Sequence, residues 1–119
     1  MNSKLKVSSI MKGLGIPANL LGYRYLQYAI DLVMSDASYI NCMVKKLYPE
    51  VAEHFGTTAP GVERACRHAI EVGWDRGDET IKQNIFSNSV NPKVGKPNNS
   101  EFIATIADYI STANECGDW

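Results

Sequence analysis

The sequence predicts an all-α domain of five to six helices that contains a helix-turn-helix. Apolar residues recur three and four positions apart along most of the chain, which is the period of an amphipathic helix. The sequence shows neither a useful run of alternating apolar and polar residues, as a strand requires, nor an internal repeat. The 119 residues, 45% of them hydrophobic, fit one domain with one modest core.

Helical spacing appears first over residues 20–34 and continues over residues 39–47. The first apolar stripe comprises Leu26, Ala29, Ile30 and Val33, extended by Leu21 and Tyr25. The second comprises Ile40, Met43, Val44 and Leu47. A short helix is expected next, because Pro49 is tolerated in a first turn and Gly56 is suited to follow a last one.

A longer helix is predicted from about Pro60 to Trp74. Thr57 and Thr58 precede it, and either hydroxyl can cap its first turn. A short helix, a three-residue turn and a longer helix over about residues 48–74 have the layout of a helix-turn-helix. In DNA-binding proteins the second helix of this unit enters the major groove.

Two further helices are predicted beyond this unit. The first spans about residues 78–86 and the last about residues 100–114, each with an apolar stripe at helical spacing. Residues 87–99 are rich in Asn, Ser, Pro, Gly and Lys, which predicts a long loop. Loops of this length are more often functional or mobile than merely connective.

The exposed side of the longer helix carries groups that can contact bases. Arg64 and Arg67 are neighbours on the helix surface, with His68 beside them. An arginine fork matches the two major-groove acceptors of guanine, and Glu63 can accept from cytosine. The hydroxyls of Thr57 and Thr58 lie where a phosphate can be held. Spacing alone leaves two interpretations open, a DNA-contacting face and an ordinary solvated face.

The charge balance excludes a wholly basic nucleic-acid coat but permits a local basic face. Twelve basic and thirteen acidic residues give a net charge of −1. Residues 1–67 hold eight basic and five acidic residues, a net +3. Residues 68–119 hold four and eight, a net −4. The positive potential therefore belongs to the half that contains the predicted arginine face.

Other function classes find no support in the sequence. Three cysteines in no paired spacing suit a reducing cytosol, and no Cys/His pattern fits a zinc site. Neither a signal peptide nor a membrane-spanning run is recognisable, so we expect a cytoplasmic protein without membrane partners. The absence of paired carboxylates or a nucleophile–base arrangement argues against an enzyme, and we expect no cofactor and no metal.

The residues also carry a family resemblance. The run VERACRHAIEVGW at Val62–Trp74 resembles the recognition helix of the stage-zero sporulation protein A family, the master transcription regulators of endospore formation. Further matches are Gly15-Ile16-Pro17-Ala18, Gly22-Tyr23, Tyr25-Leu26, Leu47-Tyr48-Pro49, Thr57-Thr58-Ala59, Lys96-Pro97 and Asn99-Ser100-Glu101-Phe102-Ile103-Ala104. The resemblance covers about Ser8 to Ile110, in order and without large gaps.

The resemblance implies a six-helix C-terminal effector domain that binds double-stranded DNA at a short TGTCGAA-like element, as a dimer on tandem copies. The base or phosphate contacts that it implies come from Glu63, Arg64, Arg67 and His68. It implies contacts to the DNA backbone from Lys12, Asn99 and Ser100. The segment of about residues 77–90 would face an RNA polymerase sigma subunit.

Two departures from the family qualify this expectation. The family regulator carries a phosphorylatable receiver domain, whereas we expect residues 1–119 to form a single effector domain without one. Pro60 and Gly61 occupy the first helical turn, where the family has a polar and a basic residue that can touch DNA. Gly61 also weakens the helix start by about 1 kcal/mol relative to alanine. An alternative is therefore a receiver-less interaction module that binds a sigma subunit or a full-length regulator.

Overall fold

The computed structural model describes residues 3–86 and 95–116. Its elements in chain order are α1 (Ser3–Gly13), α2 (Leu21–Ser35), the 3₁₀-helix η1 (Ala37–Cys42), the π-helix η2 (Met43–Leu47), α3 (Tyr48–Phe55), α4 (Ala59–Trp74), α5 (Glu79–Phe86) and α6 (Asn99–Cys116). The described ranges contain helices and no strand, which confirms the all-α class.

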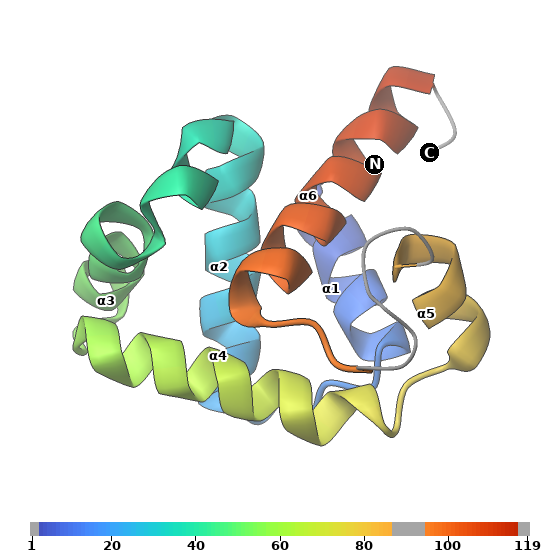
Figure 1. Cartoon of the computed structure of the whole chain (residues 1–119), viewed down its shortest axis with the longest axis horizontal. Helices are drawn as coiled ribbons and strands as arrows, with labels where there is room; N and C mark the ends of the chain where they lie inside the picture. The colour runs from blue at the N-terminus through green and yellow to red at the C-terminus, as the bar shows by residue number, and fades with distance from the viewer. Residues whose placement is uncertain (1–2, 87–94, 117–119) are drawn as a thin grey trace.

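Helix α2 lies at the centre of the fold and packs against α1, α4 and α6 (Figure 1). Its predicted apolar stripe is confirmed, since Leu26 and Ile30 are fully buried. They join a single core with residues such as Val62 of α4 and Phe102 of α6. Leu21 was expected to extend the stripe and is instead 64% exposed. The next residue, Gly22, is the one that faces α4 at this point.

The crossing of α2 and α4 is unusually close. A Cβ atom added to Gly22 would fall onto the carbonyl oxygen of Ala65 and lie 2.6 Å from the Cβ of Ala69. Only glycine permits this approach of two backbones. Helix α4 is therefore fixed against the centre of the domain by its inner side, and its other side remains open.

Residues 37–47 depart from the regular helix that their spacing predicts. They form the 3₁₀-helix η1, capped by the Asp36 carboxylate, followed by the π-helix η2. Oδ1 of Asp36 accepts hydrogen bonds from the backbone N–H of Ser38 at 3.0 Å and from its hydroxyl at 2.7 Å. Because 3₁₀ and π turns advance by other angles than an α turn, the predicted stripe does not stay on one side. Val44, assigned to that stripe, is 75% exposed.

Helix α1 is absent from the predicted elements, although Val7, Met11 and Leu14 have helical spacing and are fully buried. Helices α3, α4, α5 and α6 match their predicted ranges to within one or two residues. Most of the predicted loop 87–99 lies outside the described residues, and α6 begins at its final residue.

Candidate nucleic-acid interface

The predicted helix-turn-helix is confirmed over α3 and α4. Gly56 ends α3 with a φ of 69°, in the left-handed region that favours glycine. The next amide, that of Thr57, donates to the carbonyl of Ala52 at 2.9 Å, which closes the turn. Thr58 is the capping residue, because its Oγ1 accepts from the amide of Gly61 at 3.2 Å. These local bonds set the direction in which α4 leaves the turn.

Helix α4 has one buried side and one open side. Val62, Cys66, Ala69, Ile70 and Gly73 form the buried side. The side chains of Arg64, Arg67 and His68 lie on the opposite side and are exposed. In Figure 1 this helix runs along one edge of the domain, with α2 and α6 on one side of it only. The arrangement leaves the arginine face free to approach a partner along the length of the helix.

Glu63 occupies the margin of the open side. Its side chain is 36% exposed, and its Oε1 lies 3.5 Å from Nη1 of Arg67. This ion pair spans one turn of the helix and holds the Arg67 guanidinium, 56% exposed, against the helix surface. In the free domain Arg67 therefore already has a carboxylate partner. Arg64 has no ion-pair partner among the described residues.

The predicted phosphate contacts bracket α4 at its two ends. Thr57 and Thr58 are exposed at its beginning. Lys12 is exposed in the last turn of α1, and Gly15, three residues later, packs against Gly73 near the other end of α4. The carbonyl of Gly13 accepts from the amide of Asp78 at 3.0 Å, which ties this segment to the chain that follows α4. Helix α4, with sixteen residues, is about 24 Å long.

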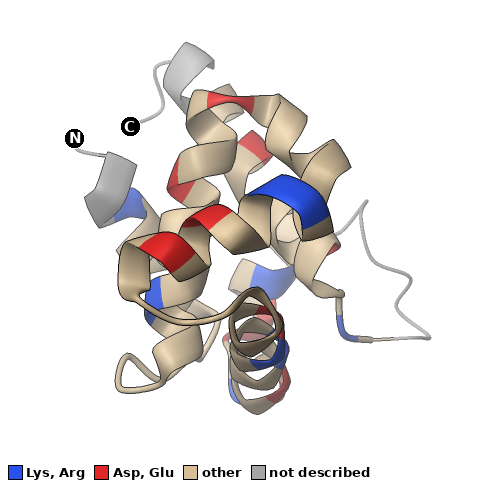
Figure 2. Ribbon diagram, turned by 90° about the vertical axis from the view of Figure 1, so that its left-hand side faces the viewer, with Lys and Arg blue, Asp and Glu red and all other residues tan. Residues whose placement is uncertain are grey.

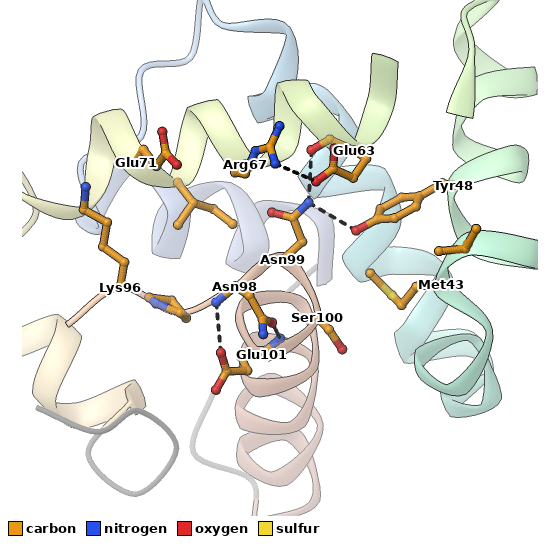
Figure 3. A pocket seen from close by; sticks show the side chains of 13 residues that line it. Met43, Tyr48, Glu63, Arg67, Glu71, Lys96, Asn98, Asn99, Ser100 and Glu101 are labelled. Atoms are coloured by element: carbon orange, nitrogen blue, oxygen red, sulfur yellow. Dashed lines mark hydrogen bonds and ion pairs between the residues drawn. The ribbon is translucent and has the colours of Figure 1, made fainter. Parts of the chain in front are cut away.

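Asn99, for which the resemblance implies a contact to the DNA backbone, has a largely buried side chain in the free domain. It is 7% exposed, and its Nδ2 donates to Tyr48 Oη and to the carbonyl oxygen of Glu63, each at 3.1 Å (Figure 3). Ser100 is half-buried beside it. The two residues lie together at the start of α6, next to α4.

The first turn of α6 supplies its own cap. The amide of Glu101 donates to Oδ1 of Asn98 at 2.8 Å, and the amide of Asn98 donates to Oε1 of Glu101 at 3.0 Å. This reciprocal pair is a capping box with asparagine in the capping position. It fixes the direction in which the chain enters α6.

A cavity of about 710 Å³ lies between α4, η2 and the chain entering α6 (Figure 3). The α4 side chains along it are Glu63, Arg67, Ile70 and Glu71, and Lys96 lines it from the other side. The Lys96 ammonium is 4.0 Å from the Asp75 carboxylate and remains 43% exposed. Lys96 is a cation that the sequence prediction missed at this margin, although it stands within the quoted Lys96-Pro97 match.

Charges of both signs occur on the interface. Figure 2 shows basic and acidic residues together on the ribbon of α4.

On the buried side of α4, burial raises the pKa of the Cys66 thiol to about 12, with the nearby Glu63 charge adding to the effect. Burial also raises the pKa of the Tyr48 phenol, against the lowering effect of its bond from Asn99. Both groups are neutral near pH 7. The charge of α4 at this pH therefore comes from the side chains on its open side.

Within residues 3–86 and 95–116, no three His, Cys, Asp or Glu side chains gather as a metal site would need. None of the described helices has the length and apolar character needed to cross a bilayer.

Comparison with known families matches residues 7–110 to the family described as "Sporulation initiation factor Spo0A C terminal". The chain belongs to this family. The match contains the whole helix-turn-helix and confirms the resemblance inferred from the recognition-helix run. The Spo0A C-terminal domain is a DNA-binding effector domain of a sporulation regulator, and the family is one of transcription factors and not of enzymes.

Proposed function

We propose that this domain recognises a specific sequence of double-stranded DNA by placing α4 in the major groove of a TGTCGAA-like element. The observation that carries the proposal is the exposed row of Arg64, Arg67 and His68 on the second helix of the helix-turn-helix. A major groove about 12 Å wide admits one helix, and its guanines offer the paired acceptors that arginine matches. The G·C pairs of the element provide such guanines on both strands.

The remaining contacts position the helix. Thr57 and Thr58 hold phosphates at the beginning of α4, and Lys12 holds a phosphate at the other end. Ser100, in the first turn of α6, contributes a hydroxyl at the margin of this face. Such contacts fix register and orientation without carrying sequence information. Glu63 contributes through Arg67, whose guanidinium it supports in the free domain.

The acidic side of the domain is proposed to face a protein. Asp75, Asp78 and Glu79 are exposed around the beginning of α5. They belong to the half of the chain with net charge −4. Residues 77–86 of the expected sigma-facing segment are described here, whereas residues 87–90 lie outside the described residues. We propose an RNA polymerase sigma subunit as the partner, with two copies of the domain on tandem DNA elements.

Fluorescence anisotropy with two duplexes tests the DNA proposal. One duplex contains the element and the other has the same bases in scrambled order, and each is titrated at several salt concentrations. We expect binding to the element to be tighter by at least about 10³-fold, the lower end for specific DNA-binding proteins. Equal affinity for the two duplexes would contradict the proposal.

One observation favours the interaction module as a second candidate. Pro60 is exposed and Gly61 half-buried in the first turn of α4, and neither has a polar side chain to offer DNA. That candidate predicts weak, salt-sensitive and sequence-indifferent DNA binding. It also predicts capture of purified sigma subunit or full-length regulator at the same protein concentrations, which a pull-down measures.

A further inference from the structure

A single side-chain amide connects three helices at the edge of the DNA-binding face. Asn99 begins α6, and its Nδ2 donates both to Tyr48, the first residue of α3, and to the main chain of Glu63 in α4. Its partners lie 51 and 36 residues away in the sequence. Figure 3 shows the Asn99 amide directly between these two groups.

The orientation of the amide follows from its partners. The Glu63 carbonyl oxygen can only accept, so the group that faces it must be the NH₂ and not the carbonyl of Asn99. In this orientation both amide hydrogens are used. The other amide atom, Oδ1, is covered by protein and has no hydrogen-bond partner.

Burying an amide whose oxygen has no hydrogen-bond partner lowers the stability of the fold relative to burying an apolar side chain. Buried polar groups are normally paired, and an apolar side chain of similar shape would avoid the unpaired acceptor. What the amide supplies, and an apolar group does not, is a directional bond to one carbonyl of α4. Polar groups of this kind can fix one arrangement among several that packing would tolerate.

The bonded carbonyl lies where it controls the direction of the arginines. Glu63 precedes Arg64 directly and Arg67 by one turn. The outer ends of helix side chains lie about 5–6 Å from the helix axis, so a 10° rotation of α4 displaces them by about 1 Å. Binding groups must be held to within about 0.5 Å for productive geometry. Small rotations of α4 are therefore enough to spoil paired hydrogen bonds to a base.

We propose that Asn99 is a positioning residue for sequence recognition, whose amide fixes the rotation of α4 and so the direction of Arg64 and Arg67. The proposal rests on the proposed DNA-binding function and assigns a different role from the phosphate contact that the resemblance implied. A phosphate contact would strengthen binding to every sequence. A positioning residue strengthens binding to the correct sequence relative to the others.

The test measures discrimination, defined as the ratio of the dissociation constants for the scrambled and the element duplex. Asn99→Ala removes both bonds, and we expect discrimination to fall by about tenfold with the salt dependence unchanged. Tyr48→Phe removes one bond and keeps the Glu63 bond, and we expect a smaller loss of about threefold. Any unfolded fraction lowers both apparent affinities equally, so it leaves this ratio unchanged.

Asn41→Ala is the matched control, because it removes the same amide from an exposed position in η1. Its discrimination should equal that of the unsubstituted domain. Should Asn99→Ala fail to fold, as judged by circular dichroism, Tyr48→Phe decides, and unchanged discrimination in that variant would overturn the proposal. Equal weakening on both duplexes, with a flatter salt dependence, would also overturn it in favour of a phosphate contact.

A double-substitution cycle separates positioning from any independent effect. In a background of Arg64→Ala and Arg67→Ala, Asn99→Ala should cause no further loss of discrimination, because its effect acts through these side chains. The same tenfold loss in that background would contradict the proposal. A domain that shows no discrimination before any substitution would instead refute the DNA-binding proposal itself, which keeps the two failures distinct.

Discussion

Arg64 and Arg67 share one face of α4 but differ in what surrounds them. Arg67 is held by Glu63 at 3.5 Å, whereas Arg64 extends from the helix with its side chain exposed. On the proposed function, Arg64→Ala should therefore remove a base contact with little rearrangement of its neighbours. We expect a cost of about 1–3 kcal/mol on the element duplex and a smaller one on scrambled DNA, measured by anisotropy.

Lys45→Ala provides the control for Arg64→Ala. It removes an equal charge from η2, outside the helix-turn-helix. A uniform charge effect weakens both duplexes alike, so discrimination should persist in this variant. If Arg64→Ala behaved in the same way, Arg64 would be contacting phosphate and not a base.

The Cys66 thiol should not react with alkylating reagents while the domain is folded. Its side chain is fully buried in α4, and its pKa of about 12 keeps the thiol protonated. The thiolate is the form that reacts with iodoacetamide. We expect alkylation at pH 8 to modify exposed Cys42 and to reach Cys66 only after urea is added, as peptide mass spectrometry would record. Fast modification of Cys66 without urea would contradict its burial.

The raised pKa of Cys66 also predicts the direction of alkaline destabilisation. The ordinary value of 9.0 applies to the unfolded chain and about 12 to the folded one, so the unfolded chain releases its proton first. The contribution of the thiol to stability is therefore complete below about pH 9 and is lost as the pH rises toward 12. Urea midpoints should fall over this interval, and a midpoint that rises there would contradict the assignment.

At the scale of the element, α4 depends on the cap at its beginning. Thr58, and not Thr57, accepts the capping bond from Gly61. Thr58→Ala should lower the free energy of unfolding by about 1 kcal/mol, since it leaves an N-terminal amide without its acceptor. Urea denaturation measures the loss, and Thr57→Ala is the neighbouring control with a smaller expected effect. Equal losses would show that the cap is not the cause.

How far the elements follow from sequence depends on how local their causes are. Gly56 and Thr58 act on residues within one turn, and both the turn and the start of α4 were predicted from them. The burial of Leu26 and Ile30 follows from their helical spacing, which places both on the side of α2 that faces the core. These features required no knowledge of distant partners, which explains their success.

The exposure of Val44 and the burial of Asn99 have causes that the local sequence does not contain. Val44 has the spacing of a buried residue, but the 3₁₀ and π turns around it change the angle per residue. Asn99 resembles a surface residue at a helix start, and only the arrival of Tyr48 and Glu63 from distant positions buries it. The exposure of the arginine face is predictable, because the helical spacing that places apolar residues on the buried side of α4 places the arginines on the other side.

At the scale of the whole molecule, the net charge of −1 conceals a separation of charge between the two halves of the chain. The exposed cations Lys12, Arg64 and Arg67 belong to the positive half, and the acidic start of α5 belongs to the negative half. Repulsion between DNA and the acidic half favours one orientation of approach over the reverse. The charge pattern therefore contributes to orientation even though it adds no net attraction.

Salt dependence provides a measurement of this orientation. Lys12→Ala should weaken binding to the element and to scrambled DNA by similar factors. It should also reduce the slope of log affinity against log salt by about 0.9, the value for one phosphate contact. Asp108→Asn is the comparison variant. It raises the net charge by one at an exposed position on α6. An unchanged slope in Lys12→Ala would place Lys12 away from the DNA.

The bond from Asn99 to Glu63 also has a consequence for the order of synthesis. Translation completes the helix-turn-helix 25 residues before it reaches Asn99, so a nascent or truncated chain contains α3 and α4 without the amide that joins them to α6. On the positioning proposal, such a fragment keeps its cations and its attraction to DNA but loses part of its selectivity. Sequence choice is then a property that the domain acquires only when its last helix is in place.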